Sequence, residues 1–71
     1  MFTDVQRKMI KNGVRNLEIF GYSGKVTEDN ILTHPFFSKY FKKELENCLG
    51  EGYDKDIKGL LSVIEKRSKI A

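Results

Sequence analysis

The stretch TEDNILTHPFFSKYFKKELENCLG, residues 27–50, decides the fold, because it holds the only proline of the chain and its densest group of aromatic residues. Thr27 is a good helix N-cap, and two acidic residues follow it where the helix dipole favours negative charge. Pro35 removes a backbone donor and disfavours helical geometry at His34. These signals predict a short helix over 27–33.

The same stretch predicts a longer helix directly afterwards. Proline suits the first position of a helix, and an apolar period resumes beyond it until Gly50 ends the pattern. We therefore expect a helix over 35–49 with one face in the core. Its expected core residues, spaced by three and four, are Phe37, Phe41, Leu45, Cys48 and Leu49.

Two further helices flank this stretch, over about 3–20 and about 54–69. Thr3 and Asp54 are suitable N-caps, and Gly21 can adopt the left-handed conformation that ends the first helix. Gly13 lies inside the apolar stripe of the first helix, where its best use is close approach of another helix. The expected core residues of this helix are Val5, Met9, Ile10, Leu17 and Phe20.

The composition is that of a small globular protein. The chain has 71 residues, of which 39% are hydrophobic and 32% are charged. This length suits one domain, and no segment shows the alternation of a β-strand. We expect an all-α fold: a compact single domain over 1–71, built as a bundle of four helices of which the second is short.

The charge and the cysteine content indicate which partners and which cellular compartment to expect. Thirteen basic and ten acidic side chains give a net charge of +3, which favours anionic partners mildly. One cysteine cannot form an internal disulfide, which favours a reducing compartment. The charged N-terminus lacks the apolar run of a secretory signal, and no segment reaches the length of a membrane span. We expect a cytoplasmic protein without membrane contact.

The sequence has too few reactive side chains in suitable spacing to predict catalysis. His34 and Cys48 are the only residues of their kinds, and their spacing matches no nucleophile and base motif. Paired metal-ligand spacings and phosphate-binding glycine loops are both missing from the sequence. We therefore expect no enzyme activity, no cofactor and no metal site.

One family resemblance covers about half of the chain. The runs VTEDNILT at 26–33, FSKYF at 37–41 and LE at 45–46 resemble a pattern in short accessory proteins of tailed phages and prophages, and DIKGLL at 56–61 resembles the last helix of that family. The residues at 34–35 depart from the pattern. The resemblance implies a small accessory gene product of unsettled activity, which acts in the cytoplasm of a bacterial host and binds a host or phage macromolecule.

The residues themselves leave two binding hypotheses. In the first, the chain binds a protein through aromatic anchors with a basic rim, and self-association into a homodimer through the same edge is a variant. Phe36 and Tyr40 project from the margin of the apolar stripe, where they can stay exposed. The candidate residues are Phe36, Tyr40, Lys39, Lys43, Tyr22 and Tyr53.

In the second hypothesis, the helices over 27–33 and 35–49 form a helix-turn-helix that binds nucleic acid. The N-terminal half of the longer helix would face the major groove, while a basic row on the first helix contacts phosphates. Two phenylalanines at the start of the would-be recognition helix and the mild net charge argue against it. The candidate residues are Arg7, Lys8, Lys11, Arg15, Ser38, Lys39 and Lys42.

Overall fold

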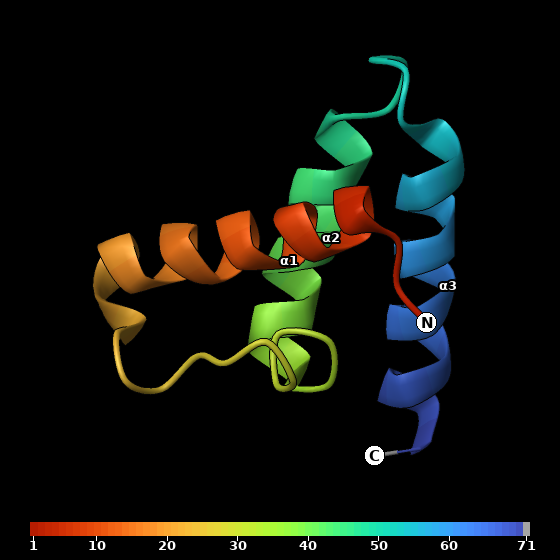
Figure 1. The fold of residues 1–71 in the computed structure, drawn as a ribbon. Helices are drawn as coiled ribbons and strands as arrows, with labels where there is room; N and C mark the ends of the chain where they lie inside the picture. The colour runs from red at the N-terminus through yellow and green to blue at the C-terminus, as the bar shows by residue number, and fades with distance from the viewer. Residues whose placement is uncertain (71) are drawn as a thin grey trace.

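The described part of the chain, residues 1–70, contains three α-helices and one π-helical turn. The computed structural model describes residues 1–70, and the side chains of residues 1–67. Two helices lie side by side and antiparallel, joined by the loop over 48–53, and the first helix crosses them (Figure 1). The radius of gyration is 11.3 Å, close to the value of about 11 Å expected for a compact chain of this length. The elements are α1 (Asp4–Leu17), η1 (Glu18–Tyr22), α2 (Pro35–Asn47) and α3 (Asp54–Ile70).

The predicted all-α compact fold is confirmed, since residues 1–70 contain no strand. The predicted number of four helices is wrong, because residues 27–33 form consecutive turns. Thr27 and Asn30 do form the reciprocal bonds of a capping box, at 2.7 and 3.0 Å, and the Asn30 side chain also donates to the carbonyl of Lys25 at 2.7 Å. The backbone N–H groups of Leu32 and Thr33, however, bond to carbonyls only three residues earlier, so the α-helical pattern does not propagate. So short a segment gains too little from propagation to form a regular helix.

The start of α1 is capped as predicted and is tied to α3. The Gln6 backbone N–H donates to Thr3 Oγ1 at 3.1 Å, and Gln6 Oε1 accepts from the Thr3 backbone at 2.9 Å, which completes a capping box. The same two side chains also donate to Asp56 of α3. One pair of residues thus both starts α1 and positions it across α3.

The end of α1 differs from the prediction. Regular α-helix stops at Leu17, and the chain continues as a π turn that Gly21 ends with φ 113°. A π turn takes more residues per revolution than an α-helix, so the following side chains rotate away from the core. Phe20 is consequently 66% exposed, and its predicted core position is wrong.

His34 begins α2. Its Nδ1 accepts hydrogen bonds from the backbone N–H groups of Phe36 and Phe37 at 3.1 and 3.4 Å, and its ring stacks on Phe37 with centroids 4.3 Å apart. The helix ends at Asn47, two residues earlier than predicted. Cys48 and Leu49 therefore lie beyond the apolar stripe and are exposed, so their predicted core positions are wrong.

The core lies where the three helices meet the turn segment. Phe41 is 1% exposed at its centre, and α1 approaches it at Gly13. A Cβ atom on Gly13 would lie 2.7 Å from Cδ1 of Phe41 and 2.9 Å from Cδ1 of Ile31. The predicted use of Gly13 as a close-approach site is thus confirmed. The buried apolar residues are Ile10, Leu17, Val26, Ile31, Leu32, Phe37, Phe41, Leu45, Ile57, Leu60 and Ile64.

Gly13→Ala should lower the free energy of unfolding by about 1 kcal/mol. The gain in helix propensity is at most about 1 kcal/mol, while overpacking costs about 1–3 kcal/mol, and the new Cβ would meet two fully buried side chains, Phe41 and Ile31. Gly59→Ala is the matched control, because its new Cβ would meet only the end of the Gln6 side chain, at 2.7 Å. Its gain of up to about 1 kcal/mol in helix propensity should offset the weakening of the single hydrogen bond from Gln6 to Asp56, so this variant should be about as stable as the native protein or more stable. Urea unfolding followed by circular dichroism measures both, and equal stability of the two variants would contradict the prediction.

Candidate functional site

The most distinctive surface feature is a group of four aromatic rings, which we call the aromatic patch: Phe20, Tyr22, Phe36 and Tyr40. Phe20 meets Tyr40 edge-on with ring centroids 5.7 Å apart. Tyr22 packs on Phe36 at 5.4 Å, and also on the buried ring of Phe37 at 5.3 Å. These separations are those of favourable aromatic pairs, so the rings support one another in fixed positions.

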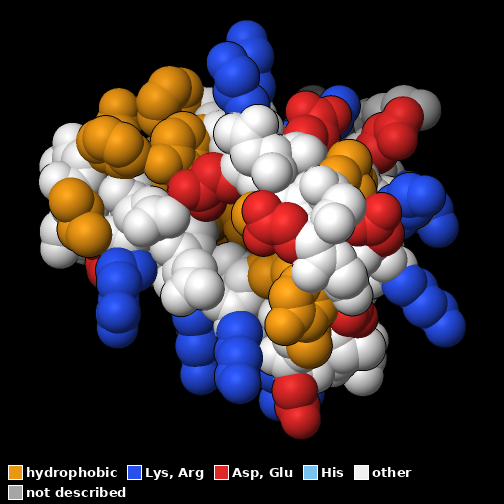
Figure 2. Space-filling view, turned by 90° about the horizontal axis from the view of Figure 1, so that it is seen from above, with side chains coloured by type: hydrophobic (Ala, Val, Ile, Leu, Met, Phe, Trp, Pro, Cys, Tyr) orange, Lys and Arg blue, Asp and Glu red, His pale blue; other side chains and the backbone are white. Residues whose placement is uncertain are grey.

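The aromatic patch is well exposed for its size. Phe20 and Phe36 are 66% and 50% exposed, and Ile19 beside them is 76% exposed. Hydrophobic side chains gather at the left of Figure 2, the end of the molecule at which Figure 1 draws η1. There the surface holds an open concavity of about 280 Å³, the aromatic concavity, lined by Leu17, Phe20, Tyr22, Phe36 and Tyr40.

Three of the four predicted aromatic anchors come together in this patch. Tyr22, Phe36 and Tyr40 belong to it, whereas Tyr53 lies in the loop at the opposite end of α2. Sequence reasoning missed Phe20, because it extended the α-helix through a residue that the π turn rotates outward. The signal that was available is Gly21, which directly follows this ring and breaks the helix.

A polar clip joins α1 to α2 beside the aromatic patch. Asn16 Nδ2 on α1 donates a hydrogen bond of 2.7 Å to Glu44 Oε2 on α2, and the Tyr40 hydroxyl also bonds to this carboxylate. Burial raises the pKa of Tyr40 above 10.0, and the negative charge of Glu44 and the hydrogen bond raise this pKa further. Glu44 is therefore already engaged within the protein.

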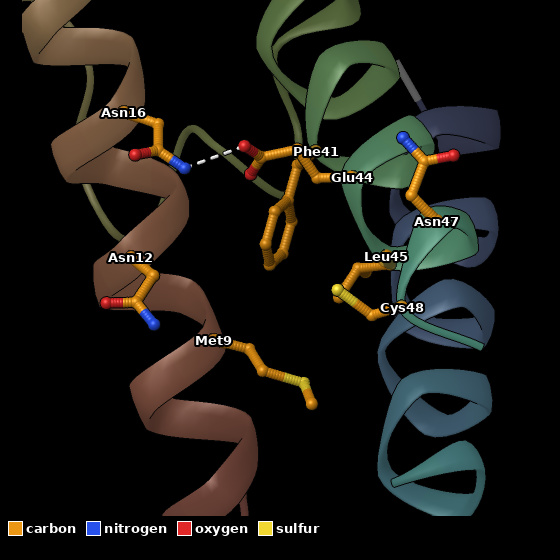
Figure 3. A pocket seen from close by; sticks show the side chains of 8 residues that line it. All are labelled: Met9, Asn12, Asn16, Phe41, Glu44, Leu45, Asn47 and Cys48. Atoms are coloured by element: carbon orange, nitrogen blue, oxygen red, sulfur yellow. Dashed lines mark hydrogen bonds between the residues drawn. The ribbon is translucent and has the colours of Figure 1, made fainter. Parts of the chain in front are cut away.

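Beyond this clip the same two helices line a second concavity of about 360 Å³, the amide concavity (Figure 3). Met9, Phe41 and Leu45 supply apolar surface, while side-chain amides of both helices and the thiol of Cys48 complete the lining. This combination of apolar and polar lining suits an apolar side chain of a binding partner that has polar groups beside it. The full lining is Met9, Asn12, Asn16, Phe41, Glu44, Leu45, Asn47 and Cys48.

The predicted basic rim is exposed along α2. Lys43 follows Tyr40 by three residues and Phe36 by seven, which places it on the same helix face as both rings. Lys39 is also exposed, three residues after Phe36. Lys39 and Lys42 line a separate hollow between α2 and α3. The aromatic patch thus has positive charge beside it on α2.

The helix-turn-helix geometry is not formed. The motif requires one helix before the turn and one after it. Residues 27–33, which would form the first helix, are turns in this structure. Ser38, predicted to face DNA, is only 4% exposed because its position on α2 faces the core, so this prediction is wrong. The predicted phosphate-contacting residues of α1 are exposed; they are Arg7, Lys8, Lys11 and Arg15.

Residues 1–70 hold neither a metal site nor a membrane span by the following criteria. Among them, no group of three or more His, Cys, Asp or Glu side chains is arranged to hold a metal ion. None of their helices combines the length and apolar character needed to cross a membrane.

Replacement of Glu44 by glutamine should lower the pKa of Tyr40 while leaving it above 10.0, because burial is the largest cause of the upward shift. In the native protein this raised pKa contributes stability that is fully present below pH 10 and is lost as pH rises through the folded-state pKa. A pH titration of the Tyr40 ring by nuclear magnetic resonance measures the effect. Glu46→Gln, on the exposed side of α2, is the control. An unchanged midpoint in Glu44→Gln would refute the assigned cause.

No protein-family model matches this chain, and neither a curated protein nor a solved structure is significantly similar to it. What the chain does must therefore be inferred from its own surface.

Proposed function

We propose that this protein is a non-enzymatic binding module that docks another protein through the aromatic patch. The observation that carries the proposal is that Phe20 and Phe36, at 66% and 50% exposure, are held in contact with the partly buried rings of Tyr40 and Tyr22. Contiguous exposed apolar surface on a small domain marks an interaction site more often than isolated exposed residues do.

The energetics favour a macromolecular partner. Each square ångström of apolar surface removed from water contributes about 25 cal/mol, so burial of two largely exposed phenylalanine rings contributes several times the thermal energy. Aromatic rings at the centre of an interface, surrounded by polar or charged residues, are the usual binding hot spots. Lys39 and Lys43 supply such a rim on α2. Because the rings are already packed together, little side-chain freedom remains to be lost on binding.

The biological setting follows from the sequence resemblance. A phage-type accessory protein in the bacterial cytoplasm would encounter host and phage proteins, and a rigid aromatic patch suits capture of either. We propose the same phage-type origin and bacterial compartment for this chain, and identification of the captured partner tests both.

Nucleic acid is the second candidate partner, favoured by one observation. Arg7, Lys11 and Arg15 are spaced by four residues on α1 and are all exposed, so they form a continuous positive row. Each phosphate neutralised should contribute about −0.9 to the log-log slope of affinity against salt. A salt-independent response in a DNA-binding assay removes this candidate.

Phe20→Ala and Phe36→Ala should each reduce recovery of a protein partner from bacterial lysate by about tenfold or more, because a hot-spot ring contributes about 1.4 kcal/mol or more. Nuclease treatment of the lysate removes capture through nucleic acid. Quantitative pull-down with the immobilised full chain measures the loss.

Tyr53→Ala is the matched control, because Tyr53 is 51% exposed but lies outside the aromatic patch. Recovery should stay within about twofold of the native value, and thermal unfolding confirms that all three variants fold. Equal losses for Tyr53→Ala and Phe36→Ala would contradict the proposal. Recovery that nuclease abolishes and that Arg7→Glu with Lys11→Glu removes would assign nucleic acid instead.

A further inference from the structure

The groove between α1 and α2 is longer than the aromatic patch alone. Phe20 of η1 faces Tyr40 of α2 at one point, and one turn further along, Asn16 of α1 bonds to Glu44. The aromatic concavity lies at the first contact, and the amide concavity lies at the second and beyond (Figure 3). Both concavities are lined by α2 and by the α1–η1 segment, so they follow one another along the seam between these elements, which we call the groove.

The distance between the two concavities fits a helical occupant. On α2, the lining residues of the aromatic concavity are centred near position 38 and those of the amide concavity near position 45. Seven residues of α-helix span about 10 Å. Positions i and i+7 of a docked helix lie on one face at this spacing, whereas same-face residues of an extended strand fall at about 7 or 13 Å. A partner helix can therefore fill both concavities at once.

The charges along the groove indicate the sign of its occupant. Lys8 and Arg15 are exposed on α1, four residues before and three residues after Asn12, which lines the amide concavity. Lys43 is exposed on the groove face of α2. The carboxylate inside the groove, Glu44, is engaged by Asn16 and by Tyr40. Three cations thus border the groove against two carboxylates, Glu44 inside it and exposed Glu18 next to Leu17, so the charge offered to the occupant is net positive.

A second copy of the chain fits these charges poorly. A twofold interface places the same surface on both sides, so the basic rims would face one another. Like charges brought together at an interface oppose association and favour a partner of opposite charge.

We infer that the occupant is an acidic amphipathic helix of the partner protein, with bulky apolar residues at i, i+4 and i+7 in the two concavities and carboxylates on the basic rims. This inference rests on the proposed function and specifies its partner. Recognition of this type is the helix-in-groove mode, in which apolar anchors provide affinity and rim charges provide selectivity.

The test uses a fluorescent synthetic peptide of about 16 residues, long enough for four helical turns. It carries leucine at i, i+4 and i+7, glutamate on the opposite face and alanine elsewhere. A first control has the same composition with the leucine stripe scrambled, and a second has lysine in place of each glutamate. We expect micromolar binding of the first peptide to the full chain by fluorescence anisotropy, and about tenfold weaker binding of each control.

Protein variants test the rims separately. Lys8→Glu with Lys43→Glu should weaken binding of the acidic peptide by about tenfold or more and strengthen binding of the lysine peptide. Lys55→Glu with Lys58→Glu is the control of equal charge change, because both residues are exposed on α3 outside the groove. It should alter binding by less than about twofold. Equal effects of the two double variants, or equal binding of all three peptides, would overturn the inference.

Three further outcomes distinguish failure of this inference from failure of the proposed function. If no peptide binds while Phe36→Ala still abolishes capture of a lysate protein, the patch is a docking site but its occupant is not an acidic helix. If the native chain dimerises in light scattering and Phe36→Ala makes it monomeric, a second copy is the occupant and the inference is wrong. If neither peptide nor lysate protein binds, the proposed function fails as well.

Discussion

The contact between Gly13 and the ring of Phe41 is the constraint on which the rest of the structure depends. An added Cβ would lie 2.7 Å from this ring, so α1 can cross the core this closely only because the residue is glycine. The close crossing brings the side chains of Asn16 and Glu44 within 2.7 Å, and it leaves the groove open on both sides of that bond. The shape of the candidate site therefore follows from one glycine in the core.

The exposed aromatic patch has a local cause in the way α1 ends. A regular helix through position 20 would direct the ring of Phe20 toward the core, as its apolar spacing predicts. The π turn instead rotates Phe20 outward against Tyr40, and Gly21, with φ 113°, redirects the chain so that Tyr22 packs on Phe36 and Phe37. Two rings thus come from η1 and two lie on α2, and each η1 ring packs on one ring of α2, Phe20 edge-on against Tyr40 and Tyr22 tilted against Phe36. A surface assembled from two elements in this way is more rigid than four independent aromatic side chains.

Sequence reasoning succeeded where one residue controls one local geometry. The cap at Thr3, the helix start at Pro35 and the close approach at Gly13 each depend on a single chemical property of one residue, and the structure confirms them. It failed where a choice between two local structures depends on the sum of small effects. The predicted cap at Thr27 forms with Asn30, but Leu32 and Thr33 bond to carbonyls three residues earlier, which helical periodicity does not reveal, and Ile31 and Leu32 are buried from turns. Of the candidate site, the sequence predicted Tyr22, Phe36 and Tyr40, but neither the partnership of Phe20 nor the distant position of Tyr53.

The distribution of charge along the groove gives Glu44 a structural role. A free carboxylate in the middle of a basic surface would repel an acidic partner and attract the neighbouring lysines into the groove. Its bonds to Asn16 and Tyr40 hold the carboxylate oxygens in place within the protein, although these neutral donors leave its negative charge. The bond from Asn16 joins α1 to α2 at the point where the two concavities meet, so Glu44 also keeps the groove walls at a fixed separation. A preformed groove loses less freedom on binding than one that must open. The charge that is least favourable to an acidic partner is therefore the one that maintains the surface for it.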